Sequence, residues 1–589
     1  MRGTLYLVVG PSGAGKDTLM DGARAALSEN ADVVFARRVV TRPADAGGED
    51  HEAVTDDDFD ARHRAGAFML DWQAHGLKYA IPSQYSDDLK AGRTVIANVS
   101  RGVIEEAIAR YSPAVVLEIS ASPEILAERL ASRGRESADD IRARLTREAA
   151  KIPSEAVKVT ILNDGTPQEG IDKFVSALSR AAPESAMLLA RKLDGGALDH
   201  DGYRAVIGDI VAGRYEDQQI ADFLVSVSES LTRDETVDLA RARADFSASI
   251  RWESDLVVDK HSMGGIPGSR ITMIVIPIVA AHGLTIPKTS SRAITSPAGT
   301  ADAMEVLARV DLDADDVRRT VKQTNGCIAW NGRLNHSRVD EVMNRITRPL
   351  KLDTLHWSVS SILSKKLAAG ATHCIIDVPL GPTAKVRSAT DAKNLRDLFL
   401  HVGAALGLHT DVRLTDGRAP IGSGIGPALE ARDVVAVLKN EPDAPADLRE
   451  KALSFAAAIL AFDPSMTEAE APIRVRELLN SGAAWETFER MCAEQGPPPE
   501  AIDIGRRTVT IAADADGTVD FIDCFALASI ARAAGAPVDK GAGLDLFARP
   551  DDTVEAGQPL YRIHARTEDG LDAARTKVAE DAAFRILEA

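Results

Sequence analysis

The sequence predicts a multidomain α/β protein. A buried apolar run at 5–9 leads through a glycine-rich loop into a helical segment. Between 255 and 495, strand-like runs such as 255–259, 271–279 and 372–380 alternate with helical segments, and short strand-like pieces with turn signals fill 501–565. At roughly 150 residues per domain, a chain of this length suggests about four domains.

Composition narrows the function classes. The 589 residues are 45% hydrophobic and 27% charged, which is typical of a soluble globular protein. Lys and Arg number 69 and Asp and Glu 88, so the net charge is −19. This acidity argues against nucleic-acid partners and against adsorption to anionic membranes. The four cysteines form no CxxC pair, which excludes a disulfide scaffold and fits a cytoplasmic protein.

The elements divide the chain in order. Residues 1–182 hold a strand at 5–9, a loop at 10–17, a helix at 18–29, inner strands at 94–99 and 114–120, charged helical stretches at 123–133 and 136–150, and a last strand at 159–162. Residues 186–252 are helical, and 338–368 are expected to join them. An α/β domain at 253–495 and a β-rich domain at 500–589 follow, separated by the break GPPPE at 496–500.

The first candidate site is the glycine loop. Its residues are Gly10, Pro11, Ser12, Gly13, Ala14, Gly15 and Lys16, which match GxxxxGK between a strand and a helix. Such a loop turns several N–H groups toward one phosphate, and its lysine reaches the β- and γ-phosphates. The loop therefore predicts an ATP site. Asp17 stands where Ser or Thr usually holds Mg²⁺, so either Asp17 or Thr18 contacts the metal.

The N-terminal domain resembles the guanylate-kinase-like superfamily. The resemblance rests on GPSGAGKDTL, RRVVTRPADAGGEDH (37–51) and ERLASRGRESADDIRARL (128–145). It implies acceptor-side contacts from Arg38, Arg42 and Glu49, and lid arginines at Arg129, Arg133, Arg135 and Arg144. Lys16, Arg133 and Arg144 would then be catalytic, because phosphoryl transfer requires a clamp of positive charge. Taken alone, each of these arginines could instead be an ordinary solvent-exposed charge on a helix.

Within that superfamily, the N-terminal domain resembles ribose 1,5-bisphosphate phosphokinases. Asp17, the acidic residue and His51 after TRPADAG, and the segment WQAHGLKYAIP (72–82) carry this closer resemblance. It implies ATP-dependent phosphorylation of ribose 1,5-bisphosphate to 5-phosphoribosyl 1-pyrophosphate.

The second candidate site combines a glycine turn with a hydroxyl-rich stretch. DKHSMGG (259–265) ends a strand, and residues 288–300 carry six hydroxyls, one Arg and one Lys. Hydroxyls, backbone N–H groups and a helix N-terminus can hold an anion, although a Ser/Thr loop can also serve only to cap a helix.

From about 191 to 575 the chain resembles the thymidine and pyrimidine-nucleoside phosphorylase family. The resemblance implies a helical domain, an α/β domain and a small barrel-sandwich-like C-terminal α+β domain. Its signature implies inorganic phosphate at Lys260, Ser262, Thr272, Ser290 and Thr300. SSILSKK (360–366) places Ser361 and Lys365 near the base. We assign no proton transfer to His261, and its side chain could equally serve only to pack under the loop.

Three segments depart from the nucleoside enzymes. GGIPGSR, SRAITSPAGT and PLGPTAKV resemble the branch of AMP phosphorylases, which act on nucleoside 5′-monophosphates. By that match the nucleotide site comprises Gly265, Ser291, Arg292, Ala293, Ile294, Thr295, Ser296, Thr300, Ser361, Lys365 and Lys385. Asp353 would protonate the leaving base, which requires a raised pKa, and its alternative is a helix N-cap.

The two resemblances meet at one metabolite. The expected function is phosphorolysis of a nucleoside monophosphate to base and ribose 1,5-bisphosphate, followed by phosphorylation of that product. The expected cofactor is Mg²⁺ with ATP, phosphate is the co-substrate, and family analogy favours a homodimer or higher homo-oligomer. Two alternatives stay open. One is a pyrimidine nucleoside phosphorylase fused to a nucleoside monophosphate kinase, and the other replaces the kinase with a non-catalytic guanylate-kinase-like binding module.

Overall fold

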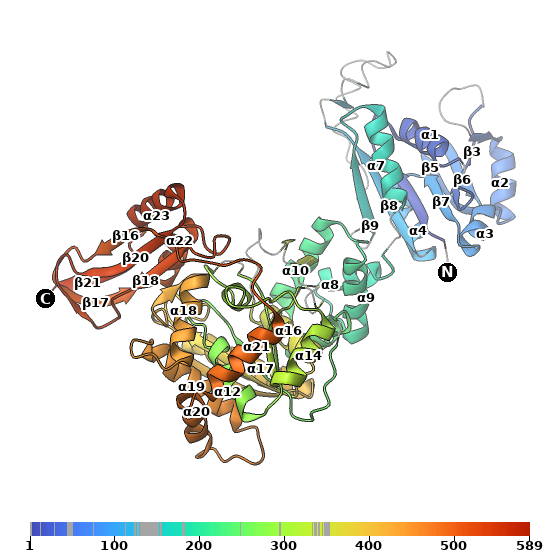
Figure 1. Cartoon of the computed structure of the whole chain (residues 1–589). Helices are drawn as coiled ribbons and strands as arrows, with labels where there is room; N and C mark the ends of the chain where they lie inside the picture. Colours follow the sequence, from blue (N-terminus) through green and yellow to red (C-terminus); the bar gives the residue numbers. More distant parts are fainter. Residues whose placement is uncertain are drawn as a thin grey trace. The chain divides into compact units, whose positions relative to one another are not determined.

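The computed structural model divides into two compact units, Met1–Ser230 and Leu231–Ala589 (Figure 1). It describes residues 3–11, 13–28, 30–43, 51–74, 76–111, 113–122, 125–126, 129, 152–153, 156–179, 183–247, 249–293, 296–332, 334, 339, 342–343, 345–346 and 354–588. None of the helices in these ranges combines the length and the apolar character that a bilayer span needs.

A five-stranded parallel sheet forms the centre of the first unit. Its strands follow the order β2 (Val33–Phe35), β7 (Thr94–Asn98), β1 (Leu5–Val9), β8 (Ala114–Ser120) and β9 (Val157–Leu162). The predicted strands at 5–9 and 114–120 are confirmed with the same bounds. Because β1 is central and fully buried, the glycine loop that follows it opens at the carboxyl edge of the sheet.

Helices cover both faces of this sheet, as the apolar strands require. Tyr6 and Val8 pack with α1 (Lys16–Ala26) and α7 (Pro167–Ser179), whereas Leu5, Leu7 and Val9 face α3 (Gln84–Lys90) and α4 (Ile104–Arg110). The first helix begins at Lys16, two residues before the predicted start, so the loop lysine is its first residue. The predicted helices at 123–133 and 136–150 lie outside the described residues, except for residues 125, 126 and 129.

A second sheet lies beside the carboxyl edge of β7. Its order is β4 (His51–Ala53), β3 (Arg38–Val40), β6 (Leu77–Pro82) and β5 (Phe68–Ala74), and only the β3–β4 pair is parallel. The amide of Ala36 donates to the carbonyl of Ile96, which ties the start of β3 to β7. A short helix, α2 (Asp56–Arg64), packs Phe59 against this sheet.

The described residues of the predicted helical segment form helices joined by turns and contain no strand. Helices α8 (Ala186–Leu193), α9 (His200–Val211) and α10 (Asp217–Ser230) belong to the first unit. Helix α11 (Arg233–Asp245) belongs to the second, where it packs along α16 (Leu355–Ala368). Thr232 caps α11 through a reciprocal bond pair with Glu235, and Thr236 bonds to His356 of α16.

Parallel strands organise the α/β part of the second unit. One sheet has the order β10 (Val258–Ser262), β13 (His373–Leu380) and β14 (His409–Asp416). A parallel pair, β11 (Ile286–Ser290) and β12 (Gly326–Trp330), adjoins β10 through a bridge between Val257 and Thr285. Around these strands lie α13 (Thr300–Met304), α14 (Ala314–Thr324), α17 (Ala389–Ala405), α18 (Pro427–Leu438), α19 (Ala446–Leu460), α20 (Ala471–Asn480) and α21 (Ala483–Gln495).

One predicted strand is wrong. Residues 271–279 form helix α12 (Thr272–His282) with Pro277 inside it. Every residue from Thr272 to Ala280 is buried, and α19 and α21 pack against the helix. A helix buried on all sides shows no amphipathic period, so a continuous apolar run looks the same in either conformation.

Two antiparallel sheets and two helices make the C-terminal part, red in Figure 1. The sheets have the orders β15 (Gly424–Ile425), β18 (Gly543–Leu546), β20 (Pro559–Ala565), β16 (Arg507–Ala512), and β19 (Thr553–Val554), β17 (Gly517–Ile522), β21 (Phe584–Glu588). Helices α22 (Cys524–Ala533) and α23 (Glu568–Glu580) pack on each other. Because β15 precedes α18, this part is joined to the α/β part by a strand pair.

Candidate functional site

The glycine loop curls tightly between β1 and α1. Gly13 and Gly15 both have φ of 90°, a left-handed conformation that favours glycine. A Cβ on Gly15 would lie 2.5 Å from Asn163 Nδ2, and Asn163 donates to the carbonyl of Ala14 at 2.8 Å. Lys16 Nζ donates to the carbonyls of Gly10 and Pro11 at 2.8 and 3.0 Å, which closes the loop.

Polar groups for a second substrate lie beside this loop. Asn98, at the end of β7, donates to Asp17 Oδ1 at 3.4 Å, and its carbonyl accepts from Arg38 Nη1 at 3.4 Å. Arg38 also lies over the ring of Tyr79, 5.3 Å from its centroid. Asn98 thus bonds both to the predicted acceptor residue Arg38 and to Asp17, the residue after the loop lysine. Asn98 was missed by sequence reasoning, because nothing in its strand distinguishes it from a core polar residue.

Two other predicted kinase arginines are placed. Arg42 approaches His51, with Nη2 3.5 Å from Nδ1, and the Arg42 carbonyl lies 3.2 Å from His51 Nε2. Arg129 Nη1 lies 3.9 Å from the position that a Cβ on Gly15 would take, so Arg129 stands at the loop. Thr18 is exposed in the first turn of α1, as is Asp17. Several predicted residues lie outside the described residues: Ser12, Glu49, Arg133, Arg135, Arg144, Ile294, Thr295 and Asp353.

The second candidate site lies at the end of β10, next to a buried cluster of charged side chains. Asp259 is fully buried, with Lys366 Nζ at 2.7 Å and Lys288 Nζ at 3.5 Å. The two lysines lower the pKa of Asp259 against the effect of its burial. Two lysines thus face one carboxylate, and burial lowers the pKa of Lys288 to about 7.

Lys260 points to the first turn of α12. Its Nζ donates to Thr272 Oγ1 at 3.2 Å and lies 5.6 Å from the centroid of Phe455. Burial lowers the pKa of Lys260 to about 7, opposed by Asp377 and aided by Lys451, Lys288 and Arg270. Thr272 begins an eleven-residue helix, whose N-terminal N–H groups favour an anion. Two predicted phosphate residues, Lys260 and Thr272, therefore meet.

Ser262 belongs to a polar network that sequence reasoning missed. Its Oγ donates to Asp377 Oδ2 at 2.9 Å, and Thr415 donates to Asp377 Oδ1 at 2.6 Å. Lys451 of α19 lies 3.2 Å from Asp377 and donates to Thr415 at 3.1 Å. Asp377 and Thr415 come from adjacent strands and Lys451 from a later helix, so no local motif joins them.

Arg270 holds the end of the hydroxyl-rich stretch 288–300 in place. Its Nη1 donates to Thr300 Oγ1 at 3.1 Å and its Nη2 to the carbonyl of Ala298 at 3.1 Å. Its Nε pairs with Glu430, a fully buried carboxylate of α18. A hydroxyl that accepts from a guanidinium still has its own proton to donate. Arg270 therefore leaves the predicted phosphate ligand Thr300 with a free donor.

Asp302 connects the two ends of the second predicted segment. Its Oδ2 accepts from the amides of Ala293 and Gly299 at 2.6 and 2.9 Å. Arg292 forms a two-pronged ion pair with Glu305 at 2.5 and 2.6 Å and lies over Trp330. Ser296 donates to the carbonyl of Ala298 at 3.0 Å, Ser290 ends β11, and Ser291 is exposed.

The remaining residues predicted for the second site belong to the turn after β10, the loop after β13 and helix α16. A Cβ on Gly265 would lie 2.9 Å from the amide of Lys385, so these two loops touch at a position that favours glycine. Lys385 Nζ donates to Ser358 at 3.3 Å and Lys365 Nζ to Ser361 at 3.1 Å, both on α16. Desolvation, with the charges of Lys366 and Lys288, holds the pKa of His261 well below its usual range.

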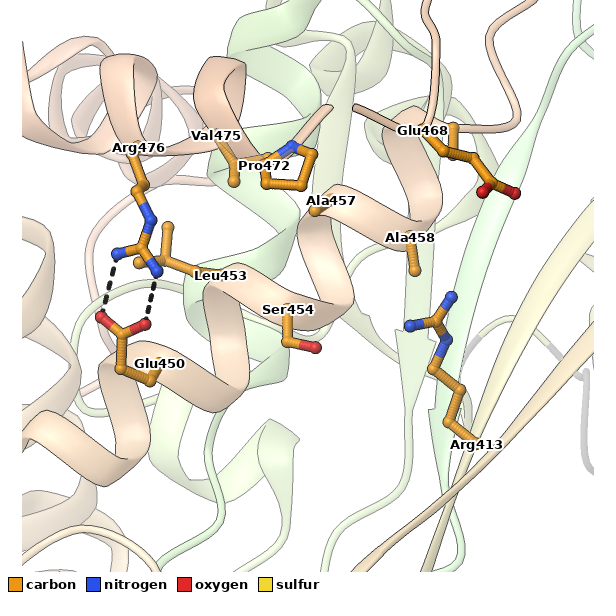
Figure 2. A pocket seen from close by; sticks show the side chains of 11 residues that line it. Arg413, Glu450, Leu453, Ser454, Ala457, Ala458, Glu468, Pro472, Val475 and Arg476 are labelled. Carbon is orange, nitrogen blue, oxygen red and sulfur yellow. Dashed lines mark hydrogen bonds and ion pairs between the residues drawn. The ribbon is translucent and has the colours of Figure 1, made fainter. Parts of the chain in front are cut away.

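A separate hollow of about 420 Å³ lies between β14, α19 and α20 (Figure 2). Its lining includes Arg413, Leu453, Ala457 and Arg476, and Glu450 pairs with Arg476 at 2.7 Å. None of the site residues predicted from the sequence is among its lining residues.

Comparisons with known proteins agree with this organisation. Residues 254–485 match the glycosyl transferase family a/b domain, residues 186–247 its helical bundle domain, and residues 518–585 the pyrimidine nucleoside phosphorylase C-terminal domain. Anthranilate phosphoribosyltransferase from Thermus thermophilus aligns over 52% of this chain and 99% of that chain, at 18% identity and a TM-score of 0.45.

Relatives cover nearly the whole chain. A bifunctional ribose 1,5-bisphosphokinase-thymidine phosphorylase from Azorhizobium caulinodans is 50% identical over 97% of this chain and 95% of its own. A protein of the same name from Cupriavidus pinatubonensis is 53% identical over 96% of this chain and 95% of its own. A third, from Roseobacter denitrificans, is 42% identical over the full length of both. The chain is therefore an enzyme that belongs to the family of bifunctional ribose 1,5-bisphosphokinase-thymidine phosphorylases.

Proposed function

We propose that the enzyme converts a nucleoside 5′-monophosphate and inorganic phosphate to free base and ribose 1,5-bisphosphate, and then phosphorylates that product with ATP to 5-phosphoribosyl 1-pyrophosphate and ADP. One observation carries the choice of a nucleotide. The predicted cations of the second site lie at separate places: Lys260 bonds to Thr272 at the start of α12, whereas Arg292 and Lys385 belong to two other loops. Phosphorolysis of a nucleoside involves one phosphate, whereas a nucleotide brings a second.

In the phosphorolysis step, Lys260, Thr272 and Thr300 would bind inorganic phosphate, with Ser262 and Ser290 completing the set. Arg292 and Lys385 would receive the 5′-phosphate. Lys365 and Ser361, which bond to each other on α16, would face the base. Asp353 would donate the proton to the leaving base. The glycosidic bond gains oxocarbenium character as it breaks, and a bound phosphate dianion stabilises that charge.

In the kinase step, the glycine loop would hold the ATP phosphates and Lys16 would move from the loop carbonyls to the γ-phosphate. Arg38 and Arg42 would bind the acceptor with Glu49, and Arg129, Arg133, Arg135 and Arg144 would surround the transferring group. Asp17 offers a carboxylate and Thr18 a hydroxyl, which are the oxygen ligands that Mg²⁺ prefers, so Asp17 or Thr18 would hold the metal. Bound Mg²⁺ would offset charge on the polyphosphate.

A second candidate is favoured by the relatives themselves. Their names include thymidine phosphorylase, which suggests a nucleoside as the substrate of the second site. In that case Arg292 would serve only to order its loop through Glu305.

One experiment separates the candidates. The purified enzyme is incubated with phosphate and, in parallel, with nucleoside monophosphates or the matching nucleosides, and free base is measured. ATP and Mg²⁺ are then added and 5-phosphoribosyl 1-pyrophosphate is measured. We expect base only from monophosphates and pyrophosphate product only after ATP. A preference for nucleosides would refute the nucleotide proposal, and base without the pyrophosphate product would refute the kinase proposal.

A further inference from the structure

We propose that Lys540, in the C-terminal part of the chain, is a positioning residue for the 5′-phosphate of the nucleotide, and that it acts through Glu305 on Arg292. This inference rests on the proposed nucleotide function. It gives the C-terminal part a place in substrate recognition.

Lys540 lies in the turn between α22 and β18, and this turn is fixed to the α/β part. The carbonyl of Lys540 accepts from the amide of Ala428, in the first turn of α18, at 3.0 Å. Nearby, a Cβ on Gly426 would lie 2.4 Å from the carbonyl of Ala542, so the two backbones are in close contact. The Lys540 side chain is therefore aimed from a rigid base, and it is only 14% exposed.

The side chain ends on the carboxylate that holds Arg292. Lys540 Nζ lies 2.5 Å from Glu305 Oε2, the same oxygen that accepts from Arg292 Nη1 at 2.5 Å. Glu305 Oε1 accepts from Arg292 Nη2 at 2.6 Å. The Glu305 side chain is 8% exposed, whereas that of Arg292 is 35% exposed. Glu305 is thus hidden behind Arg292, and Arg292 is the member of the cluster that a ligand can reach.

The charge balance explains why a lysine is needed there. Asp302 also approaches Arg292, at 3.6 Å, so two carboxylates face one guanidinium. With Lys540 the four charges sum to zero, and without it they sum to −1. Because like charges repel strongly where water is excluded, a cluster with an excess carboxylate would oppose a phosphate dianion. Lys540 neutralises Glu305. The two bonds from Arg292 to Glu305 hold the guanidinium plane over Trp330.

A purely structural role makes a different prediction. If Lys540 only fastened the C-terminal part, its removal would lower stability and affect all substrates alike. If it tunes Arg292, its removal raises the KM for the monophosphate and leaves kcat and the KM for inorganic phosphate nearly unchanged. The effect would also vanish once Glu305 had lost its charge.

The test uses the full-length enzyme and measures phosphorolysis. Lys540→Met should raise the KM for a nucleoside monophosphate about tenfold, the scale of one charge-assisted bond. Lys540→Arg should restore most of the affinity. In a Glu305→Gln background, Lys540→Met should change that KM less than about twofold. Lys577→Met, which removes an exposed ion-paired lysine of the same part, should match the wild type.

The outcomes are distinguishable. A wild-type enzyme that prefers nucleosides would overturn the proposed function and this inference together. A wild-type enzyme that uses monophosphates, with an unchanged KM in Lys540→Met, would overturn the inference alone. An equal effect of Lys540→Met in the wild-type and Glu305→Gln backgrounds would show that Lys540 does not act through Glu305.

Discussion

Among single residues, Lys260 has the most unusual environment for a predicted phosphate ligand. Its ammonium group is buried against Phe455 and the first turn of α12, and burial lowers its pKa to about 7. Lys288, nearby, has a pKa lowered to about 7 by the same cause. Above neutral pH, Lys260 of the free enzyme is therefore mostly neutral, although an anion beside it would favour its charged form. Phosphate binding is then coupled to proton uptake.

This coupling predicts the pH dependence of phosphorolysis. Below pH 7 Lys260 is already charged, so the KM expressed as the concentration of the phosphate dianion should change little. Above pH 7 each binding event requires one proton, so the KM should rise by up to about tenfold per pH unit. Initial rates at several phosphate concentrations from pH 6 to 9 measure this. Lys260→Gln should lower kcat/KM about a hundredfold and flatten the profile above pH 7. A flat wild-type profile would contradict the coupling.

Arg270 is the second residue whose removal has a calculable cost. Arg270→Met leaves the buried carboxylate of Glu430 without its ion-pair partner. We expect the free energy of unfolding to fall by about 3–5 kcal/mol, as for other broken buried pairs. Urea denaturation measures this loss.

A second variant tests the reason for that loss. Arg270→Met combined with Glu430→Gln removes both charges and should recover part of the stability. Equal destabilisation of the single and double variants would mean that the cost does not come from the stranded carboxylate.

At the scale of elements, both candidate sites include the start of a helix that follows a parallel strand. Helix α1 begins at Lys16, directly after the loop that follows β1. Helix α12 begins at Thr272, ten residues after the end of β10. In each case the strand fixes the loop and the helix dipole attracts the anion.

The glycine loop can be tested separately from the rest of the enzyme. Lys16→Ala removes the cation that would contact the γ-phosphate, so kinase turnover should fall at least about a hundredfold. Phosphorolysis should be unchanged, because the loop carbonyls to which Lys16 donates belong to the first unit. Coupled assays of ADP and free base measure the two activities. Lys90→Ala, which removes an exposed lysine paired with Asp87, is the matched control. Full kinase turnover in Lys16→Ala would refute the assignment of this site.

Elements differ in how well the sequence predicts them. The loop after β1 and the turn after β10 were predictable, because glycines, a lysine and hydroxyls stand close together in the chain. Helix α12 was predicted as a strand, since a fully buried helix has no polar face to reveal its period. The supports of the site were not predictable. Asp377 lies 115 residues beyond Ser262, and Lys451 lies 74 residues beyond Asp377 (451 − 377), so only the folded chain brings them together.

At the scale of the whole molecule, an acidic chain has local groups of cations at its two candidate sites. The net charge is −19, yet the first site collects Lys16, Arg38 and Arg129, and the second collects Lys260, Lys288 and Arg292. These groups would provide locally positive surroundings for the anionic substrates proposed above. The sites lie in different compact units, Met1–Ser230 and Leu231–Ala589.

Because each site has its own phosphate-binding groups, the two reactions should work in separate molecules. Lys16→Ala alone should convert a monophosphate to ribose 1,5-bisphosphate and stop there, and Lys260→Gln alone should phosphorylate only added ribose 1,5-bisphosphate. A mixture of the two variants with a monophosphate, phosphate, ATP and Mg²⁺ should form 5-phosphoribosyl 1-pyrophosphate. The product should appear after a lag, since the intermediate must first accumulate in solution, and more Lys16→Ala enzyme should shorten that lag. If each variant keeps its single activity and the mixture still forms no product, the intermediate does not leave the second site, where phosphorolysis forms it, and the idea of two independent sites fails.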